Sequence, residues 1–552
     1  MHHRVTKVMA SIVAAAISLA PVTPAFANNK DKNKNKFGDT TTPIKHLVVI
    51  FGENRSFDNY FATYPNADNP DGEPQFTAKK NTPSVNGLSG GLLELNPNLL
   101  NTNNTSGAAN PFRLDRSQAN TRSMNHAYGP EQAASHSGLM DLFPLNTGRP
   151  GPPPNAPPLT VLTNGQVMGY FDGNTVTAMW NYAQNFALAD NFFNTTYGPS
   201  SPGVVNLVSG QTNGMTGIQG QNGNQVDGGN GTTSGLTLIG DADPLGDTCS
   251  TSGNQAALGG PNIGDLLRAR NLTFGSFMGG FDLTITNPNG STGCSRSTFS
   301  PIVNSTVTDY IPHHAFFQYH AGTINKMHTR PASIHEIGKD GPANHNYDSH
   351  DFFDALKAGI LPAVSFIKAP AFQDAHPGNS DPLDEQTFDV QVINALMNSP
   401  FWDSTAVVIT YDDSDGWYDH VMPPVVNQST STADALTGPG ACGNGTSSAL
   451  SGGAPANLAH AQGRCGYGPR LPMLLISPWA KKNYVEHTVL DQTSVLRFIE
   501  DNWLDSQRVG PGSFDNIANS IENMFDFDKD RSDDGVLILD PNSGLVRNGG
   551  RN

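Results

Sequence analysis

Four short apolar runs, separated by long polar stretches, constrain the fold of this chain more than any other feature. They are residues 46–51, 363–367, 405–411 and 471–476, each rich in β-branched or large apolar side chains. Runs of this length are typical of buried strands. Between them, Phe388, Val392 and Leu396 recur at a helical spacing, and residues 493–503 place apolar side chains on one face. Strands alternating with helices predict an α/β fold with a mostly parallel central sheet flanked by helices.

We expect one large domain with long loop-rich insertions, although 552 residues would also allow two to four domains. Only 15% of the residues are charged, whereas Gly and Pro number 57 and 40, which is typical of a loop-rich chain. The stretches from about 96 to 164, 210 to 260 and 425 to 464 are rich in small polar residues, Gly and Pro, and are predicted insertions. The main domain is expected over residues 43–527, with a tail at 528–552.

The amino terminus has the pattern of a secretory signal. Two basic residues precede an apolar run that ends in Ala-Phe-Ala, so residues 1–27 are the expected signal, with cleavage after Ala27. Residues 28–42 form a polar, Lys-rich tether that we expect to be disordered. No later segment reaches the ~20 apolar residues that cross a bilayer. We therefore predict an exported protein, periplasmic or extracellular, with no stable membrane insertion.

The four cysteines fit an exported protein, because an even number of cysteines in an oxidising compartment is typical of disulfides. They are Cys249, Cys294, Cys442 and Cys465. Three connectivities are possible, and we predict local pairing of the first with the second and of the third with the fourth. A zinc site is the weaker interpretation, since the chain has no Cys-x-x-Cys pair.

Acidic and amide side chains follow two of the four apolar runs. Glu53 and Asn54 follow the first, and Asp412 and Asp413 follow the third. Ligands of parallel sheets bind beyond the carboxyl ends of the strands, where these carboxylates would repel one another without a cation. We predict a divalent metal: oxygen ligands suit Mg²⁺, Mn²⁺ or Ca²⁺, and nearby histidines leave Zn²⁺ or iron open. The alternative is an acidic turn that caps a helix or stays solvated.

The formal net charge of −17 argues against nucleic acid as a partner, because a phosphate backbone would be repelled overall. A local cationic site remains compatible with this charge. A metal site of the predicted kind also requires a group that can react beside it.

A candidate nucleophile lies in the sequence TYGPSSPG, residues 196–203. Proline is favoured at the first helical position, so Pro202 predicts Ser201 as the N-cap and leaves Ser200 one step outside the helix. A hydroxyl there would face a helix N-terminus, which attracts phosphate oxygens. The alternative is that both serines are ordinary turn and cap residues.

Six histidines stand beside small or turn residues instead of on apolar helical faces. They are His126, His136, His313, His314, His376 and His420. Each could protonate a leaving group, bind a phosphate oxygen or ligate a metal. Any single one could equally be a surface or hydrogen-bonded structural histidine.

Seven motifs, in order, resemble those of bacterial phosphoesterases that include secreted acid phosphatases and phosphatidylcholine-type phospholipases C. They are HLVVIFGENRSFDNYF, HAYGPEQAASHSGLMD, ALADNFFNTTYGPSSPGVVNLVSG, IPHHAFFQYH, AHP, ITYDDSDGWYDHVMPP and GYGPRLPMLLISPWAKKNYV. The resemblance covers nearly the whole predicted mature chain. It implies an alkaline-phosphatase-like fold, in which residues 43–527 form the phosphoesterase catalytic domain.

The resemblance also implies roles for individual residues. Ser200 takes the position of the nucleophile. The positions of metal ligands fall on Glu53, Asn54, Asp412 and Asp413, and those of active-site histidines on His126, His313, His314 and His376. His420 is a further candidate, and His136 receives no role.

Several departures from the family pattern favour the acid-phosphatase branch. Pro202 is followed by Gly203 where phospholipases of the family usually have Asn, Asn59 replaces a usual His, and Gln492 replaces another. The resemblance thus implies a secreted metal-dependent enzyme that hydrolyses phosphate monoesters through a phosphoserine intermediate. One alternative is a phospholipase C acting on phosphodiester headgroups, so the expected partner is a small phosphoester or a phospholipid. Another alternative is a secreted binding protein without activity.

Overall fold

The computed structural model describes residues 40–151, 161–220, 225–227, 236–251, 253–443, 463–528 and 535–547. The predicted signal at 1–27 and residues 28–39 of the predicted tether lie outside the described residues. No helix among the described residues is long and apolar enough to cross a membrane.

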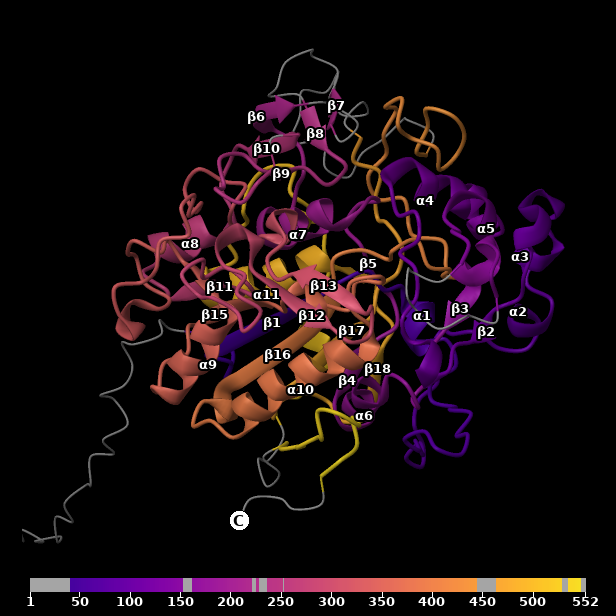
Figure 1. The fold of residues 1–552 in the computed structure, drawn as a ribbon, viewed down its shortest axis with the longest axis horizontal. Helices are drawn as coiled ribbons and strands as arrows, with labels where there is room; N and C mark the ends of the chain where they lie inside the picture. Colours follow the sequence, from indigo (N-terminus) through magenta and orange to yellow (C-terminus); the bar gives the residue numbers. More distant parts are fainter. Residues whose placement is uncertain are drawn as a thin grey trace, which may run out of the picture. The chain divides into compact units, whose positions relative to one another are not determined.

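A sheet of eight strands forms the centre of the fold, in the order β14-β11-β15-β1-β16-β17-β4-β18 (Figure 1). Its strands are β1 (His46–Gly52), β4 (Ala187–Ala189), β11 (Phe274–Met278), β14 (Asn346–Asp348), β15 (Val364–Lys368), β16 (Thr405–Tyr411), β17 (Met473–Ile476) and β18 (Tyr484–Glu486). All four apolar runs of the sequence are therefore strands of one sheet. Every residue of β1, β15, β16 and β17 is buried, as expected for strands covered on both faces.

Strand β1 lies between β15 and β16 and is parallel to both, with Leu47 opposite Val364 on one side and Ala406 on the other. The prediction of a mostly parallel sheet is confirmed. The exception is β17, which runs antiparallel to β16 and β4. A parallel return needs a crossover that is usually helical, and the described part of residues 412–472 contains no α-helix.

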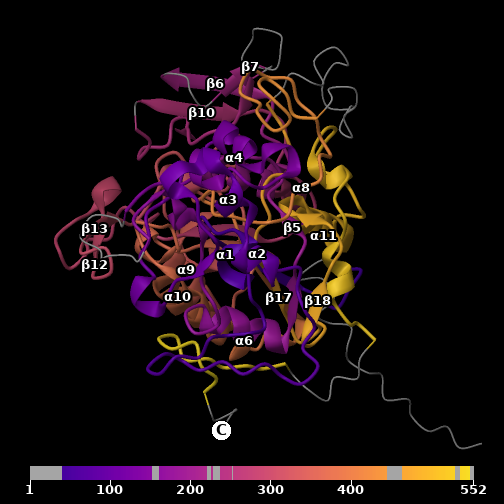
Figure 2. The same ribbon diagram turned by 90° about the vertical axis from the view of Figure 1, so that its right-hand side faces the viewer.

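Helices cover both faces of the sheet. The longer ones are α4 (Tyr128–Ser135), α6 (Thr177–Asn185), α7 (Ser200–Ser209), α8 (Ile263–Ala269), α9 (Ser349–Lys357), α10 (Pro382–Met397) and α11 (Gln492–Trp503). Figures 1 and 2 show α9 and α10 on one face and α11 on the other. The two helical patterns read from the sequence correspond to α10 and α11. Both helices begin after an aspartate N-cap, Asp381 and Asp491, whose side chain accepts hydrogen bonds from backbone N–H groups of the first turn.

The remaining elements are short and lie in the segments between the strands of the central sheet or, for the last of them, after β18. The helices are α1 (Phe57–Phe61), α2 (Gly91–Glu94), α3 (Pro97–Leu100) and α5 (Phe143–Asn146). The strands are β2 (Phe112–Arg113), β3 (Gly169–Tyr170), β5 (Phe192–Phe193), β6 (Met215–Gly220), β7 (Gln225–Asp227), β8 (Leu236–Leu238), β9 (Asp243–Pro244), β10 (Asn254–Leu258), β12 (Ser297–Ser300), β13 (Ser305–Thr308) and β19 (Leu490–Asp491).

The start of α7 differs from the prediction that Ser201 is the N-cap and that Ser200 lies outside the helix. The helix begins at Ser200, and Pro199 is its N-cap residue. Asp241, from a segment 40 residues further along the chain, accepts hydrogen bonds from the backbone N–H and the hydroxyl of Ser201 at 3.0 and 3.1 Å. A tertiary contact therefore provides the cap that the local sequence was expected to supply, and the prediction was wrong for this reason.

Both predicted disulfides are present in the structure. Cys249 bonds Cys294 and Cys442 bonds Cys465, with Cα–Cα separations of 5.2 and 5.8 Å. Each bond closes a loop within or beside one of the predicted insertions, which limits the conformations of these long segments.

Residues 535–547, near the carboxyl terminus, pack against the helices of the main domain. Leu539 is fully buried and its carbonyl accepts a hydrogen bond from Asn394 of α10 at 2.8 Å. The carbonyl of Gly544 accepts one from Asn181 of α6 at 2.9 Å.

Candidate active site

The carboxyl ends of β15, β1 and β16 meet at one edge of the sheet, and each carries a charged residue there. Lys368 is the last residue of β15, Glu53 follows β1 directly, and Asp412 follows β16. Because the three strands are parallel neighbours, these side chains meet although they are up to 359 positions apart in the chain. All three are buried, with at most 1% of each exposed.

Ser200 lies against this acidic edge. Its hydroxyl oxygen is 3.0 Å from Glu53 Oε2 and 3.2 Å from Asp413 Oδ2, so it can donate its proton to either carboxylate. The side chain is 1% exposed. The structure thus brings together the serine and the acids of both strand ends.

Two glycines allow the serine to approach this closely. Gly198 has φ +116°, a conformation that other residues rarely adopt, and it forms the turn before Ser200. Gly203, in the first turn of α7, faces the backbone of Asp412, where a Cβ atom would lie 2.0 Å from the carbonyl oxygen. A side chain at position 203 would therefore push the helix, and Ser200 with it, away from the acids.

Asn54 is held in a left-handed conformation, with φ 63°. Its backbone N–H donates to Asp412 Oδ1 at 3.0 Å and its side-chain amide donates to Asp415 Oδ1 at 2.9 Å. The side-chain oxygen of Asn54 is buried and has no hydrogen-bond partner.

The four histidines that the resemblance selects lie around these acids. His314 Nδ1 is 2.9 Å from Glu53 Oε1, and the ring of His313 lies 4.6 Å from that of His314. His126 Nδ1 is 3.1 Å from Asp415 Oδ1, and the ring of His376 lies 6.5 Å from that of His126.

The other two histidine candidates lie elsewhere. His136 pairs with Asp141 at 2.6 Å, and 42% of its side chain is exposed. His420 pairs with Asp58 at 2.7 Å beside the guanidinium of Arg470. The structure shows no contact of either histidine with Ser200 or with the acids around it.

Three residues of this region were missed by the sequence analysis. Lys368 Nζ contacts Glu53 Oε1 and lies 3.4 Å from Asp412 Oδ2. It could have been found, because it follows an apolar run as Glu53 and Asp412 do. Asp374 Oδ2 lies 3.9 Å from His314 Nδ1. Glu131 accepts a hydrogen bond from the backbone N–H of Gly198, in the turn before Ser200. Asp374 carries no local signal, whereas Glu131 lies within the quoted motif HAYGPEQAASHSGLMD but was assigned no role.

Burial and mutual repulsion shift the pKa values of the acids. Burial, with the charge of Glu53, raises the pKa of Asp412 to about 6. Burial also raises the pKa of Asp374, next to Glu53, and of Asp413, next to Asp412, well above the ordinary range. Burial acts to raise the pKa of Glu53 too, but Lys368 and other neighbours outweigh it and the pKa is lowered. The edge thus holds more negative charge than Lys368 neutralises.

The histidines are shifted in opposite directions. Burial opposes the charge of His126, but Asp413 and Asp415 outweigh it and raise the pKa well above its usual value. Burial, together with His313 and Lys368, lowers the pKa of His314 well below the usual value. His126 is therefore the protonated partner and His314 the neutral one.

The residues at this edge fit a divalent cation. Asp374 Oδ2, like the Asn54 side-chain oxygen, is buried without a hydrogen-bond partner. One ligand atom each of Glu53, His314 and Asp374 lies within 4.8 Å of the others. Unpartnered oxygens among carboxylates with raised pKa values favour a hard cation.

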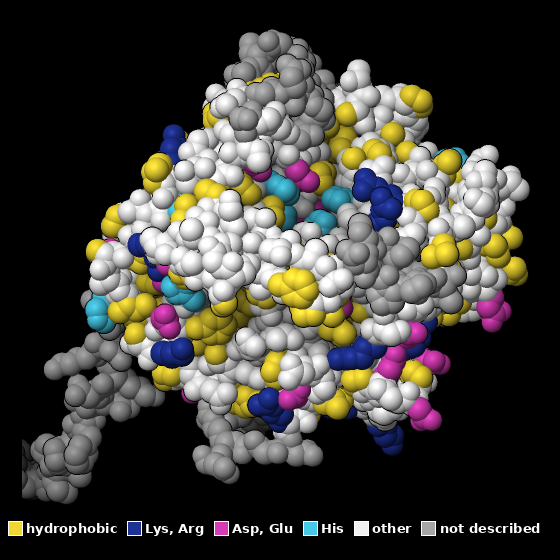
Figure 3. Space-filling model, viewed as in Figure 1, with side chains coloured by type: hydrophobic (Ala, Val, Ile, Leu, Met, Phe, Trp, Pro, Cys, Tyr) yellow, Lys and Arg dark blue, Asp and Glu magenta, His cyan; other side chains and the backbone are white. Residues whose placement is uncertain are grey.

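A pocket of about 540 Å³ opens beside this site and is lined by His126, Arg149, Pro199 and Asp241, among others. Figure 3 shows histidine side chains gathered in a hollow on the same face as in Figure 1. The volume is in the range of pockets that hold small organic ligands. Pro199, in the wall of this pocket, directly precedes Ser200.

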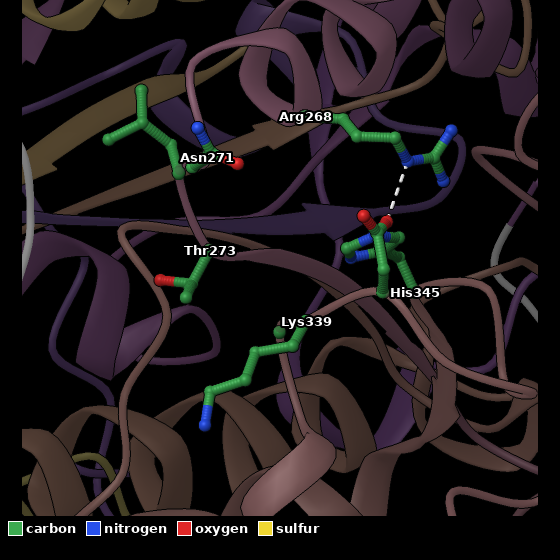
Figure 4. A pocket seen from close by; sticks show the side chains of 8 residues that line it. Arg268, Asn271, Thr273, Lys339 and His345 are labelled. Atoms are coloured by element: carbon green, nitrogen blue, oxygen red, sulfur yellow. Dashed lines mark hydrogen bonds and ion pairs between the residues drawn. The ribbon is translucent and has the colours of Figure 1, made fainter.

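A second pocket, of about 290 Å³, lies at the opposite edge of the sheet, next to the amino end of β11 (Figure 4). Arg268 Nε donates to Asp340 Oδ1 at 2.8 Å, His345 Nε2 lies 3.0 Å from the same oxygen, and Lys339 Nζ donates to the carbonyl of His335 at 2.8 Å. We assign this pocket no part in the chemistry.

Similar proteins include two phospholipases. A non-hemolytic phospholipase C of Pseudomonas aeruginosa is 25% identical over 509 residues, which cover 90% of this chain and 57% of that protein. A non-hemolytic phospholipase C of Burkholderia pseudomallei is 39% identical over 165 residues, which cover 28% of this chain and 22% of that protein. The chain thus spans about half the length of the first relative and less of the second.

A solved structure of a protein in the alkaline phosphatase superfamily from Vibrio parahaemolyticus matches 76% of this chain and 76% of its own. The TM-score is 0.24 and the identity 11%, so nothing further rests on it. The phosphoesterase family model, in contrast, matches residues 44–504, which include every residue at the acidic edge described above. This chain therefore belongs to the phosphoesterase family.

Proposed function

We propose that this chain is a hydrolase of phosphoric esters in which Ser200 is the nucleophile. The observation that carries the proposal is the position of the Ser200 hydroxyl, 3.0 Å from Glu53 Oε2 and 3.2 Å from Asp413 Oδ2 at the start of α7. Family membership and the named relatives support the same reaction class.

In the proposed first step, the Ser200 oxygen attacks phosphorus while its hydroxyl proton passes to Glu53, whose pKa is lowered and whose Oε2 lies 3.0 Å away. The bond between phosphorus and the alcohol oxygen breaks, and a phosphoserine remains. The positive end of the α7 dipole would attract the phosphate oxygens, although the Ser201 N–H at this end already donates to Asp241. His126, which is protonated, is the candidate donor of the proton that the departing alcohol takes up.

In the proposed second step, water attacks the phosphoserine, the bond between phosphorus and the serine oxygen breaks, and inorganic phosphate leaves. A histidine that gave up its proton in the first step can accept one from this water. Ser200 regains its proton from Glu53, and the cycle closes.

Glu53, Asn54, Asp412 and Asp413 are the residues that we propose to hold a divalent cation, with Asp374 and His314 as further ligands within reach. Bound there, the cation would lower the pKa of the serine hydroxyl and neutralise charge on the phosphate oxygens.

Two substrate classes follow from different observations. The departures at Asn59, Gly203 and Gln492 favour phosphate monoesters, as for the acid phosphatases of the family. The relatives are named phospholipases C, which favours a phosphodiester headgroup. Hydrolysis of p-nitrophenyl phosphate and of phosphatidylcholine by one preparation, with a panel of divalent cations and a chelator control, separates the two classes.

We also propose that the protein is exported. Two disulfides fit an oxidising compartment. Detection of the mature chain starting after Ala27 in the periplasm or medium would test this.

Ser200→Ala tests the mechanism. We expect kcat to fall on the order of 1,000-fold or more, because no other hydroxyl replaces the nucleophile, while the unfolding temperature changes little. Ser201→Ala is the matched control, since its hydroxyl contacts Asp241 and Tyr319, and it should retain activity within roughly tenfold. Wild-type turnover by Ser200→Ala would remove Ser200 from the reaction.

A further inference from the structure

Glu131 is a buried carboxylate with no role in the chemistry described so far. It lies in the first turn of α4, and 2% of the residue is exposed. Among the residues that the structure describes, no lysine or arginine forms an ion pair with it. Burial raises its pKa to about 7. A carboxyl group in such a place is costly to bury, so its contacts must compensate.

The two oxygens of Glu131 connect two segments that are far apart in the chain. Oε2 accepts a hydrogen bond from the backbone N–H of Gly198 at 3.0 Å, and Oε1 accepts one from the Ser414 hydroxyl at 2.6 Å. Gly198 lies two residues before Ser200, and Ser414 directly follows Asp413. One side chain thus spans the turn that carries the nucleophile and the loop that carries its carboxylate partner.

We propose that Glu131 is a positioning residue that fixes the separation between Ser200 and Asp413. This inference rests on the proposed function. Glu131 acts through Gly198 and Ser414, and its carboxylate accepts one hydrogen bond from each. Since a misplacement of about 1 Å can reduce turnover about 100-fold, a link of this kind bears directly on kcat.

Gln132, the next residue of α4, provides a matched control. It is fully buried, and its side-chain oxygen also accepts two hydrogen bonds, from the backbone N–H groups of Ala435 and Leu436 at 2.9 and 3.1 Å. These partners lie between β16 and β17, a few residues before Cys442. Gln132→Ala therefore removes as many bonds from the same turn of the same helix without touching either catalytic segment.

The experiment compares Glu131→Ala, Glu131→Gln and Gln132→Ala in the full chain, with p-nitrophenyl phosphate as substrate. We expect Glu131→Ala to lower kcat by about 10- to 100-fold with little change in KM. Glu131→Gln should recover most of the activity, because its oxygen can accept from Gly198 and its amide can donate to Ser414. Gln132→Ala should keep kcat within a few-fold of the wild type.

Hydrogen exchange gives a readout that does not depend on activity. We expect Glu131→Ala to speed amide exchange in residues 196–201 by about tenfold, as for the loss of one buried hydrogen bond. Gln132→Ala should instead speed exchange in residues 433–437. If the chain hydrolyses no phosphoester, the proposed function fails, and this exchange pattern still decides whether Glu131 holds the turn.

Three results would overturn the inference. They are unchanged exchange in residues 196–201 of Glu131→Ala, an equal loss of kcat in Gln132→Ala, or a loss in Glu131→Gln as large as in Glu131→Ala, which would assign the effect to charge. Should Glu131→Ala fail to fold, Ser414→Ala breaks the same link from the other side and should give the same change in kcat and exchange.

Discussion

Two buried acidic clusters lie beside each other in the chain but differ in how their charge is balanced. The site cluster consists of Glu53, Asp374, Asp412 and Asp413, with Lys368 as its lysine. The Arg470 cluster consists of Asp58, Asp419, His420 and Arg470. Each cluster joins the segment after β1 to the segment after β16. Both clusters therefore form where the same two loops meet. They differ in the group that balances the negative charge.

In the Arg470 cluster, all three nitrogens of the guanidinium donate hydrogen bonds. It donates to both oxygens of Asp419 at 3.1 Å, to Asp58 Oδ1 at 3.0 Å and to the carbonyls of Asn86 and Asp190 at 2.7 and 2.8 Å. Its Cζ atom lies 4.2 Å from the centroid of the Phe57 ring. The arginine therefore balances this cluster without a metal ion, although Asp58, Asp419 and His420 carry side chains that can ligate one.

In the site cluster, four carboxylates share one lysine, and Asp374 keeps a buried oxygen without a hydrogen-bond partner. The comparison teaches that acid content alone does not indicate a metal site. The indication is the excess of buried negative charge that the chain leaves unbalanced.

The largest expected effect is on stability, from Arg470→Met. Removing the guanidinium leaves two buried aspartates without their cation, which should lower the free energy of unfolding by about 3–5 kcal/mol. Urea unfolding of the purified variant measures this, and added divalent cations should not restore the loss. Restoration by cations would show that the Arg470 cluster can itself hold a metal ion. The two clusters would then not differ in their need for a metal.

An intermediate effect is expected from Lys368→Met. The metal-free variant should lose about 1–3 kcal/mol, as for a buried charged group that loses its partner, because the acids can take up protons instead. Saturating divalent cation should restore stability, since the site cluster binds it only in the folded state. Equal unfolding curves with and without cation, in both the variant and the wild type, would contradict a metal site at this edge.

The smallest expected effect concerns pH. Burial acts to lower the pKa of His420, but Asp58 outweighs it and the pKa is raised above its usual value. A histidine with a raised pKa stabilises the fold fully below the unfolded value of about 6.5, and this contribution is lost as the pH rises through the folded pKa. His420→Gln should therefore cost on the order of 1 kcal/mol at pH 5.5 and less at pH 9.

Denaturant unfolding of wild type and His420→Gln across this pH range provides the measurement. A difference that stays constant with pH would mean that the charge of His420 does not stabilise the fold, and that Arg470 alone balances the cluster.

Much of the fold could be predicted from the sequence because its signals are local. The four apolar runs became β1, β15, β16 and β17, and the spacing of apolar residues marked α10 and α11. The same reasoning selected Glu53, Asn54, Asp412 and Asp413, because residues after parallel strands must meet at one edge. Lys368 was within reach of this rule and was overlooked.

The remaining features depend on contacts between distant segments. Asp241 caps α7 in place of a local residue, and Asp374 reaches the site from a loop without a distinguishing pattern. Glu131 lies in a quoted motif, but only the folded chain shows that it contacts Gly198 and Ser414. His420 is a histidine in a turn, as the site histidines are, yet it pairs with Asp58 in the Arg470 cluster. No pattern of spacing separates these cases.

The sequence by itself determined four of the eight strands of the central sheet, its mostly parallel character and the acids at two strand ends, since periodicity and burial act over a few residues. Only the tertiary structure decided which acids are balanced within the chain and which are left in excess. That choice depends on where one arginine and one lysine come to lie, and such positions are set by packing across the whole domain.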